Sequence, residues 1–363
     1  MFEAQYYKII YFLIVGILTF FVSFNYLGYN VNRVQKSRRR PQFGTVLLTI
    51  VMIVLIGFRP ISGRYFIDMR GYASSYASNF YAPFEFTWQT TNKIFDNLFL
   101  FMASKGIPVE TFFFMMAFLY FGAMYMACRR LFPRDTMIAM LVCLAAFSTY
   151  PYAVNGIKAG VAASIFLMAI AYREKIILSV VLALISWGFH HSMQVVVVAY
   201  VLVLFVRNPK YYFLFWIVSL VLSALHVTFF QTLFANYTDD QGAGYLVFES
   251  NEHWAEVIRF RPDFILYSAL PVAIGYYTVI VRHVKSSIYL FILELYLMTN
   301  GVWMLCMYAT FTNRIAYLSW FMYPIVLLYP FTGTVWDKRQ YRYMTYVVLG
   351  HLLISIFLLF IYS

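Results

Sequence analysis

Charged residues are scarce in this chain: only 12% of its 363 residues are Asp, Glu, Lys or Arg. Soluble domains carry about a quarter charged residues, so an ordinary soluble protein is excluded. Hydrophobic residues make up 63% of the chain and aromatic residues 21%. Segments such as 9–27 and 343–362 are apolar along their length, whereas barrel strands alternate apolar and polar residues. We therefore predict an all-α, polytopic integral membrane helical bundle.

Cysteine is also rare, with three residues that all lie in or beside apolar segments. This odd number shows no disulfide framework and no metal-ligand spacing, so we expect neither a metal site nor a cofactor. Acidic residues number 15 against 27 cations, giving a net charge of +12. No nucleic-acid recognition motif accompanies this charge, so cationic loops that face the cytoplasm are the better explanation.

Most cations fall in short clusters between apolar segments. We place 17 of them on the cytoplasmic side with only three acids, as the positive-inside rule predicts. These clusters contain residues 33–40, 129–134, 173–175, 207–210, 282–285 and 338–342. Each interval between clusters holds two apolar arms, among them roughly 137–152 and 315–335, which gives about twelve membrane segments with both termini outside. We expect one membrane domain over 1–363.

Several arms are shorter than the ~20 residues of a full crossing. The shortest pair, 176–189 and 193–206, meets at His190 and His191. We expect a re-entrant hairpin or two helices broken around a polar cavity there. Two long outside loops, 59–107 and 231–263, complete the topology. In the first, 97–102 reads as an interfacial helix; in the second, 236–242 reads as a mobile flap.

The first outside loop carries a cation-rich motif. If the chain is helical after Gly63, Arg64, Asp68 and Tyr72 recur every four residues and share one face. With Arg59 and Arg70 nearby, this pattern suits a phosphate receptor, because guanidinium groups bind phosphate bidentately. The Asp68 carboxylate could act as a base or accept a hydrogen bond from a sugar hydroxyl. An ion pair that only anchors the loop is the alternative.

Other polar residues interrupt apolar arms. Lys158 opens a span rich in small residues, where it either snorkels to the interface or binds pyrophosphate. His190 and His191 lie within an apolar stretch and are functional candidates by position, with a satisfied core histidine as the alternative. Arg314 opens a late span. Arg259 and Arg261 precede another, where lipid headgroups are equally suitable ligands.

These landmarks, in this order, resemble the EpsG-family branch of the Wzy-type polysaccharide polymerases. The matching pieces are the Asp68-x-x-x-Tyr72 motif, the small-residue helix start at 156–162, the 189–192 motif and the 314–317 motif. The resemblance covers roughly residues 50 to 330. The family often has arginine at the position of Lys158. Lysine keeps the positive charge but lacks the planar guanidinium that binds phosphate bidentately.

The resemblance implies a metal-independent glycosyltransferase of the membrane C-type class in the bacterial inner membrane. Its partners would be undecaprenyl-diphosphate-linked oligosaccharides, membrane lipids and a chain-length regulator protein, without nucleic acid. Asp68 or His190 would be the catalytic base. Substrate would be bound on the periplasmic or extracytoplasmic side by these residues: Arg59, Arg64, Arg70, Tyr72, Lys158, His191, Arg314, Arg259 and Arg261.

Two other functions fit part of the pattern. A membrane O-acyltransferase that modifies glycans also places histidine among apolar helices, but it gives no reason for an arginine-rich outer mouth. A transporter or flippase for lipid-linked sugars would be expected to show related halves, and no repeat is evident.

Overall fold

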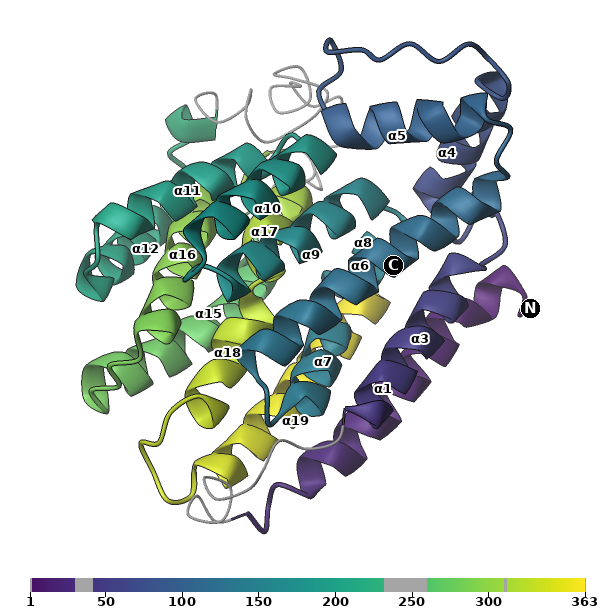
Figure 1. Cartoon of the computed structure of the whole chain (residues 1–363). Coiled ribbons are helices and arrows are strands. Elements are labelled where there is room, and N and C mark those ends of the chain that lie inside the picture. The colour runs from purple at the N-terminus through teal and green to yellow at the C-terminus, as the bar shows by residue number, and fades with distance from the viewer. Residues whose placement is uncertain (1, 30–41, 232–259, 310–311, 363) are drawn as a thin grey trace. The chain divides into compact units, whose positions relative to one another are not determined.

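The computed structural model describes residues 2–29, 42–231, 260–309 and 312–362. Within these ranges the regular secondary structure is entirely helical, without any strand. Figure 1 labels the helices along the chain. Six helices are long and apolar enough to cross a membrane by length and composition. They are Ala4–Phe24, Val109–Leu131, Pro262–Val281, Ser287–Leu305, Thr312–Thr332 and Gln340–Ile361. The prediction of an all-α membrane bundle is therefore confirmed.

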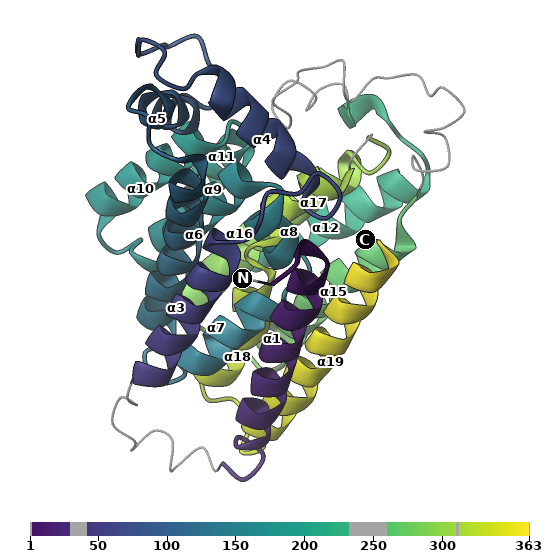
Figure 2. The same ribbon diagram turned by 90° about the vertical axis from the view of Figure 1, so that its right-hand side faces the viewer.

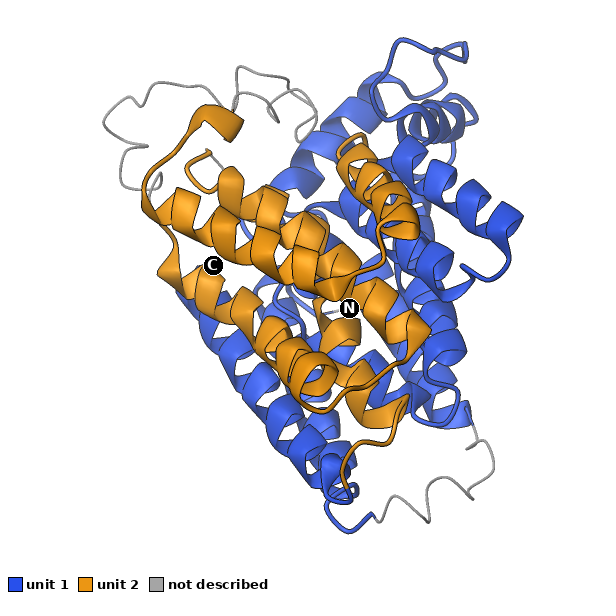
Figure 3. Cartoon of the chain, turned by 90° about the vertical axis from the view of Figure 1, so that its left-hand side faces the viewer, with its two compact units in different colours: residues 1–190, 338–363 blue, residues 191–337 orange. Residues whose placement is uncertain are grey.

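The chain divides into two compact units, coloured separately in Figure 3. Unit 1 comprises Met1–His190 and Lys338–Ser363, and unit 2 comprises His191–Asp337. The boundary falls between the two adjacent histidines. The expectation of a single membrane domain stays a prediction.

Unit 1 is built around α9, whose residues are almost all buried between α6 and α10. Its last helix, α19, returns to pack on α1 and α7, as Figure 2 shows for α1. Its helices are α1 (Tyr7–Phe24), α3 (Phe43–Gly57), α4 (Ile67–Ser78), α5 (Lys93–Ser104), α6 (Val109–Leu131), α7 (Thr136–Ala145), α8 (Thr149–Val154), α9 (Ile157–Ala171), α10 (Ile176–Phe189) and α19 (Gln340–Ile361).

Unit 2 is built around α16, which packs against α11, α12, α15, α17 and α18. A short π-helix, η3 (Tyr277–Val281), follows α15. The helices are α11 (Met193–Phe205), α12 (Pro209–Ala224), α15 (Pro262–Tyr276), α16 (Ser287–Leu305), α17 (Thr312–Trp320) and α18 (Tyr323–Thr332).

Two arms that the sequence predicts as single segments are broken helices. The arm at 137–152 is α7 followed by α8, and the arm at 315–335 is α17 followed by α18. Proline favours both breaks, because its ring clashes with the carbonyl four residues earlier. Pro151 disfavours a continuous helix at Phe147, and Pro324 disfavours one at Trp320. The Thr149 hydroxyl donates to the Cys143 carbonyl (2.6 Å) and satisfies a group at the end of α7.

A buried polar cluster fixes the helices of unit 2 against one another. The Asn300 amide on α16 accepts from Trp216 Nε1 (2.8 Å) and donates to the Ser268 (3.2 Å) and Ser319 (2.9 Å) hydroxyls. Trp320 Nε1 donates to the same Ser268 hydroxyl at 2.7 Å. A fully satisfied cluster of this kind specifies one packing of α12, α15, α16 and α17.

Candidate functional site

Arg59 lies just beyond the end of α3 and is only 3% exposed. Its guanidinium donates to the carbonyls of Ile56 (2.7 Å) and Val154 (3.1 Å). The Nε–H is buried and finds no partner among the residues described. The same part of the chain places no carboxylate within ion-pair distance of Arg59.

Aromatic rings surround this cation. The Arg59 Cζ atom lies 5.6 Å from the ring centroid of Phe66 and 5.4 Å from that of Phe113. Burial lowers the pKa of Arg59 to about 10, while the nearby hydroxyls of Tyr150 and Tyr7 act in the opposite direction. The group therefore stays positively charged at neutral pH. A buried cation with a spare donor is a place where an anion can bind.

The Val154 carbonyl connects Arg59 to the break between α8 and α9. Lys158 stands in the first turn of α9, and this turn contains no acidic residue. The first turn of a helix carries partial positive charge, to which Lys158 adds. The Asn155 side-chain oxygen at this break is buried, with no partner in the described part of the chain. Sequence reasoning noted Asn155 only as part of a motif, although an Asn-Gly pair before a helix is a visible signal.

His190 caps the end of α10 in an extended conformation and is half-buried. Its backbone N–H donates to the Ser186 carbonyl at 3.1 Å. One turn before His190, the Ser186 hydroxyl donates to the Ala162 carbonyl of α9 at 2.7 Å. Ala162 is one turn beyond Lys158, so this bond sets the end of α10 beside the start of α9.

The helix of the first outside loop reaches the same end of unit 1. α4 begins at Ile67, directly after Phe66, whose ring faces Arg59. Asp68 is half-buried in the first turn of α4, and Tyr72 follows one turn later. The Tyr72 ring contacts Phe95 of α5 with centroids 5.8 Å apart.

Arg64 takes a different position from the one predicted. α4 contains Asp68 and Tyr72, but Arg64 lies in the turn before it, so Arg64 does not share their helical face. Phe66 explains the difference, because its backbone (φ −132°, ψ 76°) is not helical and its ring is fully buried. Arg64 and Arg70 are both exposed. The Arg70 side chain folds against Gly63.

Unit 2 carries the remaining candidates. His191 Nε2 lies 2.9 Å from Gln194 Nε2 at the start of α11. Arg314 is exposed in the first turn of α17, and the Thr312 hydroxyl beside it accepts from Trp303 Nε1 at 2.9 Å. Arg259 lies outside the described residues, as does the flap expected at 236–242.

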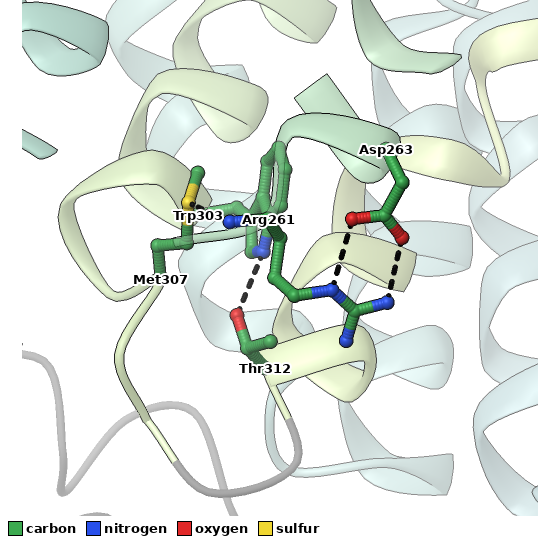
Figure 4. A network of polar contacts seen from close by, with 5 residues as sticks. All are labelled: Arg261, Asp263, Trp303, Met307 and Thr312. Carbon is green, nitrogen blue, oxygen red and sulfur yellow. Dashed lines mark hydrogen bonds and ion pairs between the residues drawn. The ribbon is translucent and has the colours of Figure 1, made fainter. Parts of the chain in front are cut away.

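Arg261 is buried and already bonded within its own helix start. Its Nε donates to Asp263 Oδ1 (3.1 Å) and its NH2 group to Oδ2 (2.8 Å), as Figure 4 shows. The guanidinium also stacks 3.5 Å from the centroid of the Phe264 ring. This bidentate pair fixes the start of α15.

In unit 1 these contacts link Arg59 to the start of α4 and to the break that precedes Lys158, and they fix the last turn of α10, before His190, against α9. Glu294 on α16 is 1% exposed and pairs with Arg207 across 3.6 Å in unit 2. It is therefore bound to a cation that the topology places on the cytoplasmic side.

Comparison with known proteins identifies the family of the chain. The model of the EpsG family matches residues 43–363 and so confirms the resemblance. No curated protein matches the chain, and no solved structure matches it. The match extends over nearly the whole described structure, including every candidate residue of both units. The chain therefore belongs to the EpsG family, which is associated with glycosyltransferase-like polymerase activity in polysaccharide biosynthesis.

Proposed function

We propose that this membrane protein is a Wzy-type polymerase that joins oligosaccharide units carried on undecaprenyl diphosphate. The reaction would take place at the outer face of the bacterial inner membrane. The observation that supports it best is Arg59, a buried cation with a spare N–H donor beside Lys158 and the start of α9. A prenyl diphosphate supplies the missing anion.

In this mechanism the growing chain is the donor substrate. Arg59 and Lys158 bind its diphosphate. Asp68 or His190 takes the proton from a hydroxyl of a second lipid-linked unit. That oxygen forms a bond to the anomeric carbon of the donor as the bond to the diphosphate breaks. The cations stabilise the charge on the departing diphosphate.

Replacement of Arg59, Asp68 and His190 tests this function. We expect Arg59→Gln, Asp68→Asn and His190→Ala each to shorten the polysaccharide to single repeat units on a glycan gel. Lipid-linked repeat units should accumulate in the same cells. Arg130→Gln is a matched control, because it removes an exposed cation that pairs with Glu174 across 3.3 Å. Long chains in all three variants, at normal protein levels, would refute the proposal.

Two further measurements separate the rival functions. In the same cells, an O-acyltransferase would change the acylation of the glycan at unchanged chain length, which mass spectrometry detects. Purified protein in liposomes would, if it were a flippase, move lipid-linked sugar across the bilayer without forming a glycosidic bond. The chain-length regulator expected as a partner would alter the length distribution without abolishing polymer.

A further inference from the structure

Aromatic side chains form an exposed strip on the loop between α4 and α6. We call Phe84, Phe86, Trp88 and Phe101 the aromatic strip. Trp88 is 72% exposed and Phe86 is 54% exposed. The rings pair with one another, with centroids 4.9 Å apart for Phe86 and Trp88 and 5.5 Å apart for Phe84 and Phe101. Exposed apolar patches of this kind mark interaction surfaces.

Two lysines accompany the strip. The Lys93 ammonium lies 5.7 Å from the Trp88 ring centroid, and the Lys105 ammonium lies 5.8 Å from that of Phe101. Aromatic rings beside lysines are typical of the membrane–water interface. There the rings lie at the level of the headgroups and the ammonium groups reach water and phosphate.

The position of α5 sets the level of the aromatic strip relative to the membrane surface. Lys105 lies four residues before Val109, where the membrane-spanning helix α6 begins. Gly106 makes the turn between them with φ +65°, and the Ile107 N–H donates to the Met102 carbonyl at 3.2 Å. Figure 1 shows α5 lying across the end of α6 instead of running alongside it. The end of α5 is therefore held at the level where α6 meets the membrane surface.

The opposite face of α5 holds the helix that carries Asp68. Phe95 contacts Tyr72, and Phe99 contacts Tyr76 with centroids 5.0 Å apart. The Tyr76 hydroxyl also donates to the Ile107 carbonyl at 2.9 Å. α5 thus has one aromatic face against α4 and α6 and a second, exposed one.

From this geometry we propose that the aromatic strip inserts into the phospholipid headgroup layer at the start of α6. The loop 80–107 is then a membrane anchor, with Trp88 and Phe101 in lipid and Lys93 and Lys105 at the phosphates. Through α5, the anchor fixes the height of α4 above the membrane. This inference does not depend on the reaction that the protein catalyses.

Spin-label accessibility in phospholipid nanodiscs tests the anchor. A nitroxide is attached to Trp88→Cys and, as a matched control, to Ser74→Cys on the exposed polar face of α4. The three native cysteines are buried, so labelling of the unchanged protein gives the background. We expect the ratio of oxygen to nickel-chelate accessibility to be severalfold higher at position 88 than at position 74, because oxygen concentrates in lipid.

Equal ratios at the two positions would overturn the proposal, since Trp88 would then be in water. A second outcome would also overturn the proposal: equal oxygen-to-nickel ratios at positions 88 and 74, followed by a fall in both the oxygen and the nickel-chelate accessibility at position 88 when polysaccharide is added. That result would assign the strip to glycan binding. Phe86→Cys repeats the measurement one strip residue away. It guards against a local effect of the label at position 88.

Discussion

Arg59 occupies a position that is unfavourable for folding. A pKa lowered from 12.5 to about 10 by burial corresponds to about 3 kcal/mol of destabilisation of the charged form. The hydrogen bonds to the carbonyls of Ile56 and Val154 offset part of this cost. A residue retained at such cost is better explained by ligand binding than by stability.

We predict that Arg59→Met abolishes polymer formation with little loss of stability. Removal of the buried charge relieves about 3 kcal/mol. The Ile56 carbonyl keeps the backbone N–H of Arg59 as a donor at 3.4 Å, so the main cost is the lost donor to the Val154 carbonyl, about 1–3 kcal/mol. These opposing effects nearly cancel. Thermal unfolding of the purified variant in detergent should therefore stay close to that of the unchanged protein. A large fall in melting temperature would mean that Arg59 is mainly structural.

Individual side chains show where sequence reasoning reaches its limit. Periodicity placed Asp68 and Tyr72 on one helix, and the structure has them on α4. Periodicity could not show that Phe66 would be drawn into the core and delay the helix past Arg64. Nor could it show that Asn300 would accept a hydrogen bond from Trp216, because the two residues lie far apart in the chain and meet only through tertiary packing.

At the level of elements, the contact between α8 and α9 requires glycine. A Cβ atom at Gly160 would lie 2.8 Å from the backbone carbonyl oxygen of Tyr152 and 3.1 Å from its Cβ. Backbone cannot move aside as a flexible side chain can. The two residues after Tyr152 lead to Val154, whose carbonyl binds Arg59.

We predict that Gly160→Ala displaces α8 and reduces polymer formation severalfold. Gly122→Ala on α6 is the control, because a Cβ atom there meets nothing within 4 Å and alanine favours a helix. Glycan gels and thermal unfolding of both variants make the comparison. If Gly160→Ala is as active as Gly122→Ala, the close contact is not needed to position Arg59.

The positions of the apolar arms were predictable from the sequence, because each arm is a run of apolar residues. The breaks within the arms were harder to predict. Pro151 and Pro324 could have predicted that two arms are broken, yet hydropathy alone joins α7 to α8 and α17 to α18. The approach of α8 to α9 was foreseeable only as a run of small residues.

For the whole molecule, the distribution of cations predicts that both termini lie outside and that the 207–210 segment lies inside. Alkaline phosphatase, which is active only outside the cytoplasm, should be active when fused after Tyr362 and inactive when fused after Asn208. A fluorescent protein that folds only in the cytoplasm should give the reverse pattern. Phosphatase activity at both positions would contradict the predicted orientation.

The return of α19 to unit 1 has a consequence for synthesis of the chain. The Thr345 hydroxyl on α19 donates to the Ser23 carbonyl, and His351 bonds the Val142 carbonyl. Lys8 on α1 reaches the Leu359 carbonyl. These bonds join helices that precede unit 2 in the chain to a helix that follows it. Unit 1 therefore lacks α19 until all of unit 2 has been translated. A nascent chain that stalls near residue 337 leaves α1 and α7 without this packing partner.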